Sequence, residues 1–146
     1  MKLLLLSAII LLSTYQLNAQ KAEQIKFQSI GFEEALTLAK KEGKGVLVNY
    51  STKGCVPCRQ MEANVYTNAS LASYVNKHFI SLKLDPVKDS QLRQMAREQH
   101  QVKGFPTLIF FNAEGMILTR NTGFMDAETM QKLADEAIKH SSFIKK

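Results

Sequence analysis

The sequence predicts an α/β fold in which a central mixed β-sheet carries helices on both faces. Apolar segments with strand character alternate with amphipathic helical segments along the chain, a pattern typical of strands joined by helices that cover a sheet. Both cysteines lie three residues apart in Cys55-Val56-Pro57-Cys58, where a strand gives way to a helix. A glycine and a proline, Gly104-Phe105-Pro106-Thr107, directly precede a second, unbroken apolar strand. These three observations organise the interpretation of the whole chain.

The N-terminus has the composition of a secretory signal peptide. Met1-Lys2 is a short basic start, an apolar run extends from Leu3 to Leu12, and the segment ending at Ala19 resembles a cleavage site. A membrane anchor is the alternative, but the apolar run is shorter than the roughly 20 residues that span a bilayer. We therefore expect residues 1–19 to be a cleaved signal peptide and residues 20–146 to form one exported, periplasmic domain.

The composition is that of an ordinary globular domain. Of 146 residues, 45% are hydrophobic, which is sufficient for a single core. The formal net charge is +6, but no cluster of basic residues is interleaved with aromatic residues and there is no Trp. Nucleic-acid binding is therefore not indicated. We expect a monomer that uses neither a metal nor a cofactor.

Residues 20–28 are expected to be a short strand or an extended lead-in to the first helix. The helix itself is predicted from residue 32, because its apolar residues recur at helical spacing, with acidic residues at its start and basic residues at its end, as the helix dipole favours. Gly43 and Gly45 are expected to end this helix. The strand over residues 46–50 is almost wholly apolar, which is typical of a central strand buried on both faces.

The cysteine motif is expected to open the next helix, because Pro57 is well tolerated in a first helical turn. A further short helix, capped by Thr67 or Asn68, is expected to end near His78. The alternating residues 79–84 are then predicted to be a strand.

The remaining segments complete an α/β domain. Asp89 or Ser90 is expected to cap a helix that ends before Val102. The two apolar segments within residues 107–119 are joined by a turn that ends in glycine, which predicts an antiparallel hairpin at one sheet edge. Asp126 is expected to cap the last helix.

From residue 27 to its end, the chain resembles the thioredoxin fold, through its strand, its CxxC at a helix start and its later Gly-x-Pro-Thr segment. It is also similar to secreted thioredoxin-like domains and to the periplasmic C-terminal domain of the transmembrane disulfide reductase. The segments that carry this closer similarity are Phe32-Glu33-Glu34-Ala35-Leu36 and Cys58-Arg59-Gln60-Met61-Glu62. The resemblance implies a cis peptide bond before Pro106, which would face the active site, and a backbone at Phe105 that meets a bound peptide.

The chemistry of the motif follows from the needs of a thiolate. A cysteine with a pKa near 8.5 is mostly protonated at neutral pH, so the attacking sulfur must be stabilised as an anion. Cys55 lies at a helix N-terminus, and Lys53 and Arg59 add positive charge nearby. We therefore assign Cys55 as the attacking thiol and Cys58 as the resolving thiol.

Two departures from the common thioredoxin pattern affect proton transfer. Asn49 stands where that family usually has a buried aspartate, which accepts the proton of the resolving thiol. By position, the lysine near that acid falls at Ser81, and the Trp before the first cysteine falls at Gly54. Glu62 lies four residues past Cys58, one turn along the same helix face. It is therefore the candidate proton acceptor, with a solvated helix glutamate as the alternative.

Other interpretations of the cysteine pair remain open. A static disulfide is one, although a loop of this size constrains the unfolded chain little. Half of a zinc site is another, but His78, His100 and His140 lack the paired spacing of such sites.

The expected function is reduction of disulfides in exported proteins, with a membrane-embedded thiol-disulfide electron donor. Val56 and Pro57 are uncharged, which favours a reducing couple. A disulfide oxidase or isomerase is the first alternative. A peptide-binding, chaperone-like module that uses the groove beside Pro106 is the second.

Overall fold

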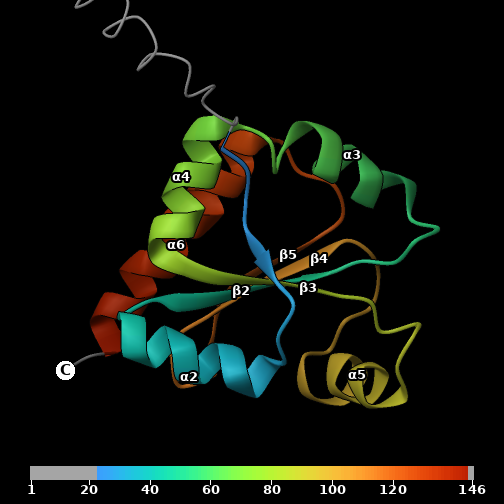
Figure 1. Cartoon of the computed structure of the whole chain (residues 1–146), viewed down its shortest axis with the longest axis horizontal. Helices are drawn as coiled ribbons and strands as arrows, with labels where there is room; N and C mark the ends of the chain where they lie inside the picture. The colour runs from blue at the N-terminus through green and yellow to red at the C-terminus, as the bar shows by residue number, and fades with distance from the viewer. Residues whose placement is uncertain (1–22, 145–146) are drawn as a thin grey trace, which may run out of the picture.

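Five strands form one mixed sheet in the order β1-β3-β2-β4-β5 (Figure 1). The computed structural model describes residues 23–144, so the expected signal peptide lies outside the described residues. Strands β1, β3 and β2 run parallel, and β4 and β5 are antiparallel to their neighbours. The strands are β1 (Phe27–Gln28), β2 (Gly45–Tyr50), β3 (Phe79–Leu84), β4 (Thr107–Phe111) and β5 (Ile117–Thr122). The predicted mixed sheet with an edge hairpin is confirmed.

Helices cover both faces of the sheet, as predicted (Figure 1). One core packs α3, α4 and α6 against the sheet, and the other packs α2 and the α5 region against the opposite face. The helices are α2 (Phe32–Glu42), α3 (Val56–Asn64), α4 (Ala69–His78), α5 (Ser90–Gln94), the π-helix η2 (Met95–Gln99) and α6 (Ala127–Ile144).

Strand β2 lies in the middle of the sheet and contributes to both cores. Leu47 belongs to the core beneath α3, α4 and α6, whereas Val46 and Val48 belong to the core beneath α2. This alternation explains why the β2 sequence is almost continuously apolar. Asn49 therefore faces α3, and Tyr50 faces α2 and η2.

Side-chain caps fix the starts of the helices. The Asn68 carboxamide oxygen accepts from the backbone N–H of Leu71 at 3.0 Å, so Asn68 rather than Thr67 begins α4. Asp89 accepts from two backbone N–H groups at the start of α5. Asp126 accepts from the N–H of Thr129 at 2.8 Å. Both aspartates were expected caps.

Gly45 does not end a helix, and the prediction that it does is wrong. Gly43, with φ of 66°, forms the C-cap of α2 in the left-handed region, where glycine is favoured. Gly45 instead begins β2, where a Cβ atom would lie 2.7 Å from the carbonyl oxygen of Phe111 and 2.9 Å from the ring of Phe79. Close packing of strands, rather than helix termination, explains this glycine.

The segment after Asp89 is not the single α-helix that its apolar spacing predicts. Helix α5 continues into the π-helix η2, in which the N–H of His100 bonds to the carbonyl of Met95 at 3.0 Å. This wider turn leads to Gln101, a non-glycine residue with a positive φ of 50°. The chain thereby turns toward the segment that carries Pro106.

Candidate active site

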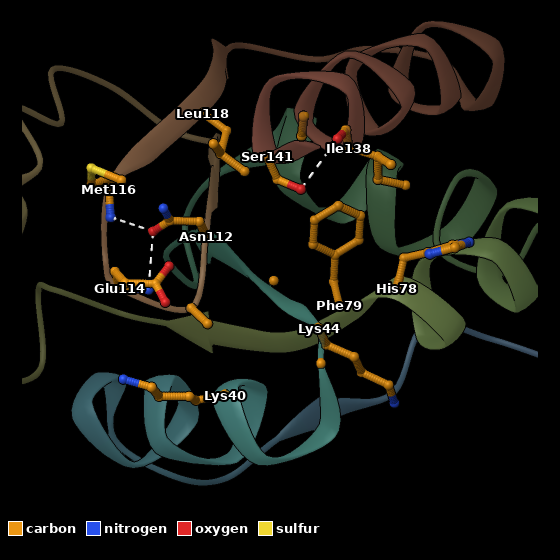
Figure 2. Close-up of a pocket in the computed structure, with 14 residues that line it drawn as sticks. Lys40, Lys44, His78, Phe79, Asn112, Glu114, Met116, Leu118, Ile138 and Ser141 are labelled. Atoms are coloured by element: carbon orange, nitrogen blue, oxygen red, sulfur yellow. Dashed lines mark hydrogen bonds between the residues drawn. The ribbon is translucent and has the colours of Figure 1, made fainter. Parts of the chain in front are cut away.

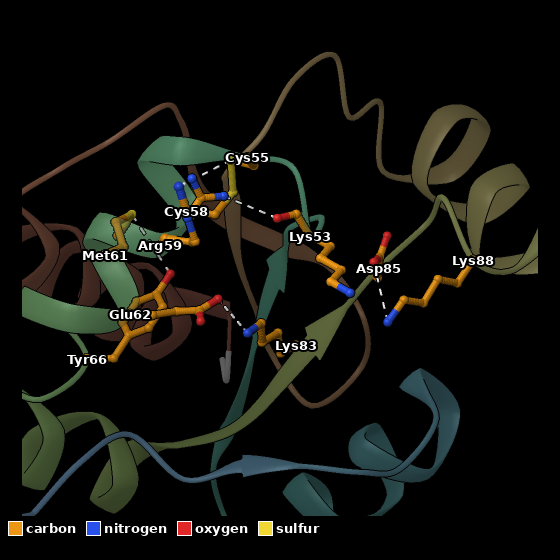
Figure 3. A network of polar contacts seen from close by, with 10 residues as sticks. All are labelled: Lys53, Cys55, Cys58, Arg59, Met61, Glu62, Tyr66, Lys83, Asp85 and Lys88. Carbon is orange, nitrogen blue, oxygen red and sulfur yellow. Dashed lines mark hydrogen bonds and ion pairs between the residues drawn. A yellow bond between two sulfur atoms is a disulfide. The ribbon is translucent and has the colours of Figure 1, made fainter.

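The two cysteines form a disulfide where β2 hands over to α3. Their Cα atoms are 5.3 Å apart and the S–S bond is 2.03 Å. Cys55 is the N-cap of α3, and its Sγ accepts from the backbone N–H of Cys58 at 3.2 Å (Figure 3). Cys55 is half-buried, whereas Cys58 is only 2% exposed. Cys55 is therefore the more exposed of the two cysteines.

Pro106 lies at the same end of the sheet as the disulfide. The peptide bond between Phe105 and Pro106 is cis, as the resemblance implied. The next residue, Thr107, pairs with Tyr50, the last residue of β2 before the cysteine loop. The carbonyl of Pro106 accepts from the N–H of Gly123 at 2.8 Å. The two segments singled out in the sequence thus meet at one edge of the fold.

Two large apolar side chains near these segments are open to solvent. Val56, inside the motif, is 55% exposed, and Phe124, which follows Gly123, is 50% exposed. Exposed apolar side chains of this size beside a reactive group are suited to contact with another polypeptide. Phe105 is half-buried and packs against the core beneath α2.

Lys53 and Arg59 are joined beside the disulfide. The Arg59 guanidinium donates through Nη1 to the backbone carbonyl oxygen of Lys53 at 3.2 Å (Figure 3). Both side chains are exposed. They bring two positive charges to the residues that flank the motif, as expected from their positions.

Glu62 is held in an ion pair with Lys83. Lys83 Nζ lies 2.5 Å from Glu62 Oε1, and both side chains are partly exposed (Figure 3). In the pairing of β2 with β3, Lys83 stands opposite Asn49, whereas Ser81 stands opposite Leu47. A basic residue, Lys83, is therefore paired opposite the position of the missing acid, two residues after Ser81, where the family's lysine falls by position.

The side chain of Asn49 is buried on the face of β2 that α3 covers. Asn49 is 1% exposed, and its side-chain oxygen has no hydrogen-bond partner within residues 23–144. Burial and the Glu62 carboxylate raise the pKa of Tyr66 well above its usual value, opposed by a hydrogen bond from Asn49. The Tyr66 hydroxyl also lies 3.9 Å from the sulfur of Met61. Tyr66 and Lys83 are thus neighbours of the site that the sequence interpretation missed.

A separate polar pair lies on the opposite face of β2. The Tyr50 hydroxyl and Nδ1 of His100 are 2.6 Å apart. His100 is 5% exposed and packs against the rings of Phe32 and Phe111 at centroid distances of 4.9 and 4.8 Å. Burial, aided by the charge of Arg120, lowers the pKa of His100 to about 4. From the sequence, we weighed His100 only as a zinc ligand. In the structure its ring packs against Phe32 and Phe111 and bonds to the Tyr50 hydroxyl.

Two hollows mark the two ends of the sheet. The larger, about 510 Å³, lies at the end remote from the cysteines, with Phe79, Asn112 and Ile138 among its walls (Figure 2). The smaller, about 420 Å³, lies beside the motif and is lined in part by Lys53 and Arg59. Of these two hollows, the smaller one adjoins the reactive group. A third hollow, of about 300 Å³, is lined in part by Gly104 and Phe105, directly before Pro106.

Fold and site together define a thioredoxin-like protein, and the chain belongs to this family. Residues 32–138 match the thioredoxin-like domain. The match extends from the start of α2 into α6, so it includes the disulfide, Pro106 and most residues of both cores. Within residues 23–144, no helix is both long enough and apolar enough to cross a membrane.

Particular relatives narrow the comparison. Over 118 residues the chain is 28% identical to the thiol:disulfide interchange protein DsbD of Vibrio vulnificus, covering 79% of this chain and 20% of that protein. It therefore spans about a fifth of the length of such relatives. A candidate disulphide-isomerase of Bacteroides thetaiotaomicron has 31% identity and a TM-score of 0.70, with 81% of this chain and 96% of that chain covered. The oxidised C-terminal domain of DsbD from Neisseria meningitidis, at 16% identity, shares the fold with a TM-score of 0.62 over 77% of this chain and 98% of that one.

Proposed function

We propose that this protein is a thiol-disulfide oxidoreductase that reduces disulfides in exported proteins through the Cys55–Cys58 couple. The observation that carries the proposal is the disulfide itself, with Cys55 at the start of α3 and Cys58 buried one turn deeper. A bridge that closes so short a loop contributes little to stability, so a reactive role explains its position better than a structural one.

The reaction is an exchange in two steps. The Cys55 thiolate attacks one sulfur of a substrate disulfide, which forms a mixed disulfide and releases the other substrate sulfur as a thiolate that takes up a proton. Cys58 then loses its proton and attacks Cys55 Sγ, which releases the second substrate sulfur and closes the Cys55–Cys58 bridge. Two electrons pass to the substrate. A second dithiol must then supply two further electrons to reduce the Cys55–Cys58 bridge, and is itself oxidised to a disulfide.

Three features support the thiolate of Cys55. The N–H of Cys58 already donates to its sulfur at 3.2 Å, and the positive end of the α3 dipole favours an anion there. Lys53 and Arg59 add charge at the same end of the helix.

The exposed side chains of Val56 and Phe124 offer an apolar surface to the substrate chain.

Glu62 is the proposed proton acceptor for Cys58. Glu62 lies one turn further along α3 than Cys58. Its carboxylate is 2.5 Å from the ammonium of Lys83, which lies in β3 opposite Asn49 of β2. A carboxylate accepts a proton, whereas the Asn49 amide does not. Lys83 acts as a positioning residue, since it touches Glu62 rather than the reacting sulfur atoms.

The proposed direction is reduction. The residues between the cysteines, Val56 and Pro57, carry no charge that would strongly favour the thiolate, and relatives include thiol:disulfide interchange proteins. We propose export to the periplasm after cleavage near Ala19, with electrons supplied by a membrane-embedded thiol-disulfide donor. The partners are then exported proteins whose disulfides are to be reduced.

Equilibration with glutathione tests this direction. A reduction potential near −270 mV is expected for a reductase, whereas a potential near −120 mV would contradict the proposal in favour of an oxidase. Cys55→Ser should lose insulin reduction, and Cys58→Ser should accumulate a mixed disulfide because the second step is blocked. A Cys55→Ser variant that still binds its partners, in a protein whose wild type does not reduce insulin, would point to a binding module.

Isomerase activity is a second candidate, favoured by the 31% identity to the Bacteroides thetaiotaomicron protein. An isomerase must re-form bridges as well as break them. Reactivation of a scrambled, fully oxidised substrate by a catalytic amount of this protein, without added reductant, would favour isomerisation over net reduction.

A further inference from the structure

The hollow beside the disulfide is rich in charge. Its volume is about 420 Å³, and it lies between the loop before the motif, α3 and the turn that follows β3. Four of its side chains are basic and two are acidic, namely Lys53, Arg59, Lys83, Lys88, Glu62 and Asp85. The balance within the hollow is therefore positive.

Both carboxylates of the hollow already have partners. Glu62 binds Lys83 at 2.5 Å. Asp85 accepts from the N–H of Val87 at 3.1 Å, and its other oxygen lies 3.8 Å from Lys88 Nζ. Throughout residues 23–144, no carboxylate is within ion-pair distance of Lys53 or Arg59. Two cations at the mouth of the hollow thus lack compensation from the protein itself.

These two cations are attached to the reactive motif. Arg59 directly follows Cys58, and one of its five N–H donors is used by the Lys53 carbonyl, at 3.2 Å. The N–H of Cys55 in turn bonds to the carbonyl of Thr52 at 3.1 Å. The loop, the arginine and the disulfide therefore form one connected unit (Figure 3).

The far wall of the hollow is also preformed. Arg93 donates to the carbonyl oxygens of Pro86 and Val87 at 3.2 and 3.0 Å, which holds the turn that carries Lys88. A ligand entering from the side of the disulfide would meet the charges of Lys53 and Arg59 with little rearrangement of the backbone.

We propose that this hollow binds an acidic segment of the partner polypeptide, with an Asp or Glu side chain close in sequence to the reacting cysteine. The proposal rests on the proposed function, because the segment is brought there by disulfide exchange at Cys55. A carboxylate can accept from the remaining N–H donors of Arg59 and from the Lys53 ammonium, and the positive balance of the hollow favours its approach. Lys53 and Arg59 then have two roles: they lie beside the Cys55 thiolate, and they select partners that carry an acidic residue.

Paired peptides test this selection. Two disulfide-containing peptides differ only in having Glu or Gln beside the cysteine, and each rate with the reduced protein is divided by its rate with a small neutral dithiol. This division removes the effect of Glu on the peptide disulfide itself. We expect the Glu peptide to react about fivefold faster in low salt, as one to two exposed ion pairs allow, and the preference to fade at about 1 M salt, where the Debye length is about 3 Å.

The double variant K53Q/R59Q should bring the Glu:Gln ratio close to one. Lys40→Gln is the matched control, because it removes an exposed positive charge from the opposite end of the sheet and should keep the ratio. Equal loss of both rates, with the ratio preserved, would assign Lys53 and Arg59 to thiolate stabilisation and overturn the proposal. A wild-type ratio of one would do the same.

Binding without exchange separates the two hypotheses. Peptides with Ser in place of Cys are titrated into the protein while backbone NMR signals of Lys53, Arg59 and Lys88 are followed. Larger shifts with the Glu peptide than with the Gln peptide support the hollow as a docking site, and equal shifts contradict it. If neither cysteine peptide reacts, the proposed function fails, and this titration still decides the docking.

Discussion

Asn49 and Tyr50 are neighbours in β2, yet their side chains enter two polar environments of different kinds. Tyr50 meets His100 in a pair 2.6 Å apart, enclosed by aromatic rings. Asn49 faces α3 with its oxygen unpartnered, near an ion pair that is open to water. One strand thus carries a satisfied polar contact on one face and an incompletely satisfied one on the other.

The difference separates stability from chemistry. Buried polar groups with full hydrogen bonding lock a core, whereas a proton-transfer site needs groups that change their bonding during the reaction. The Tyr50–His100 pair has no route to the cysteines through the described hydrogen bonds, while Glu62 shares α3 with Cys58. We expect substitutions on the Tyr50 face to change the free energy of unfolding, and those on the Asn49 face to change rates.

The largest expected effect is a pH dependence of stability that originates on the Tyr50 face. The pKa of His100 is about 4 in the folded protein and near 6.5 in the unfolded chain, so below pH 6.5 the unfolded chain binds the proton more readily. Stability is therefore complete above pH 6.5 and falls as the pH drops toward 4, by about 3 kcal/mol in total. Urea unfolding at several pH values measures this fall, and His100→Gln, which does not titrate, should remove its share. An unchanged slope in that variant would contradict the assignment.

Tyr50→Phe should lower the free energy of unfolding by about 1 to 2 kcal/mol. The variant leaves Nδ1 of His100 without its partner in a site that is 5% exposed. The rate of insulin reduction at 25 °C should change little, because the Tyr50 side chain lies on the face of β2 opposite to Asn49 and α3. Urea denaturation paired with a turnover assay checks both parts. A large loss of turnover in a folded Tyr50→Phe protein would break the separation between the two faces.

Glu62→Gln should slow the Cys58-dependent release of a trapped mixed disulfide by a factor on the order of ten. This is below the usual range for general-base catalysis, because the partly exposed site lets water take over in part. Stopped-flow resolution rates against pH measure the effect, and Glu136→Gln on α6 is a control for the loss of one exposed acid. An unchanged pH profile would remove Glu62 from the mechanism.

The smallest expected effect is that of Lys83→Gln. Its ion pair with Glu62 is partly exposed, so the free energy of unfolding should fall by less than about 1 kcal/mol. The Cys58-dependent resolution step should nevertheless slow, because the Glu62 carboxylate loses the ion pair that holds it on the α3 side of β3. A merely structural role would lower stability and leave the resolution rate unchanged.

Most of the fold could be predicted from short-range patterns in the sequence. The caps at Asn68 and Asp89, the apolar face of α2 and the doubly buried β2 each depend on a few adjacent residues, and all appear where the sequence predicts them. Cys55 at the start of α3 belongs to the same class. A helix start depends on consecutive residues, so the position of the cysteine motif at the start of α3 could be predicted from the sequence.

Features that depend on distant partners were not accessible in this way. Lys83 is placed opposite Asn49 by the register of β3 against β2, and a shift of one residue would move it to the other face. The widened turn η2 arises where apolar spacing alone predicts a regular helix. Gly45 also reflects a close approach to Phe111 that no local pattern reveals. Alternation along β3, with Lys83 as its exposed residue, is the signal that marks the lysine as a surface neighbour of α3.

The cap of α3 links the redox equilibrium to folding. The N–H of Cys58 donates to the sulfur of Cys55 in the bridged form, and a thiolate is a stronger acceptor for the same donor. The free energy by which the helix start stabilises the Cys55 thiolate in the folded protein also adds to the stability of the reduced protein. Because folding and reduction form a closed thermodynamic cycle, the same free energy makes the couple more oxidising. Unfolding the bridged and dithiol forms separately in urea therefore reports the potential, with about 1.4 kcal/mol for each 30 mV. The donor that stabilises the Cys55 thiolate, and so favours nucleophilic attack, therefore also makes the dithiol form a weaker reductant.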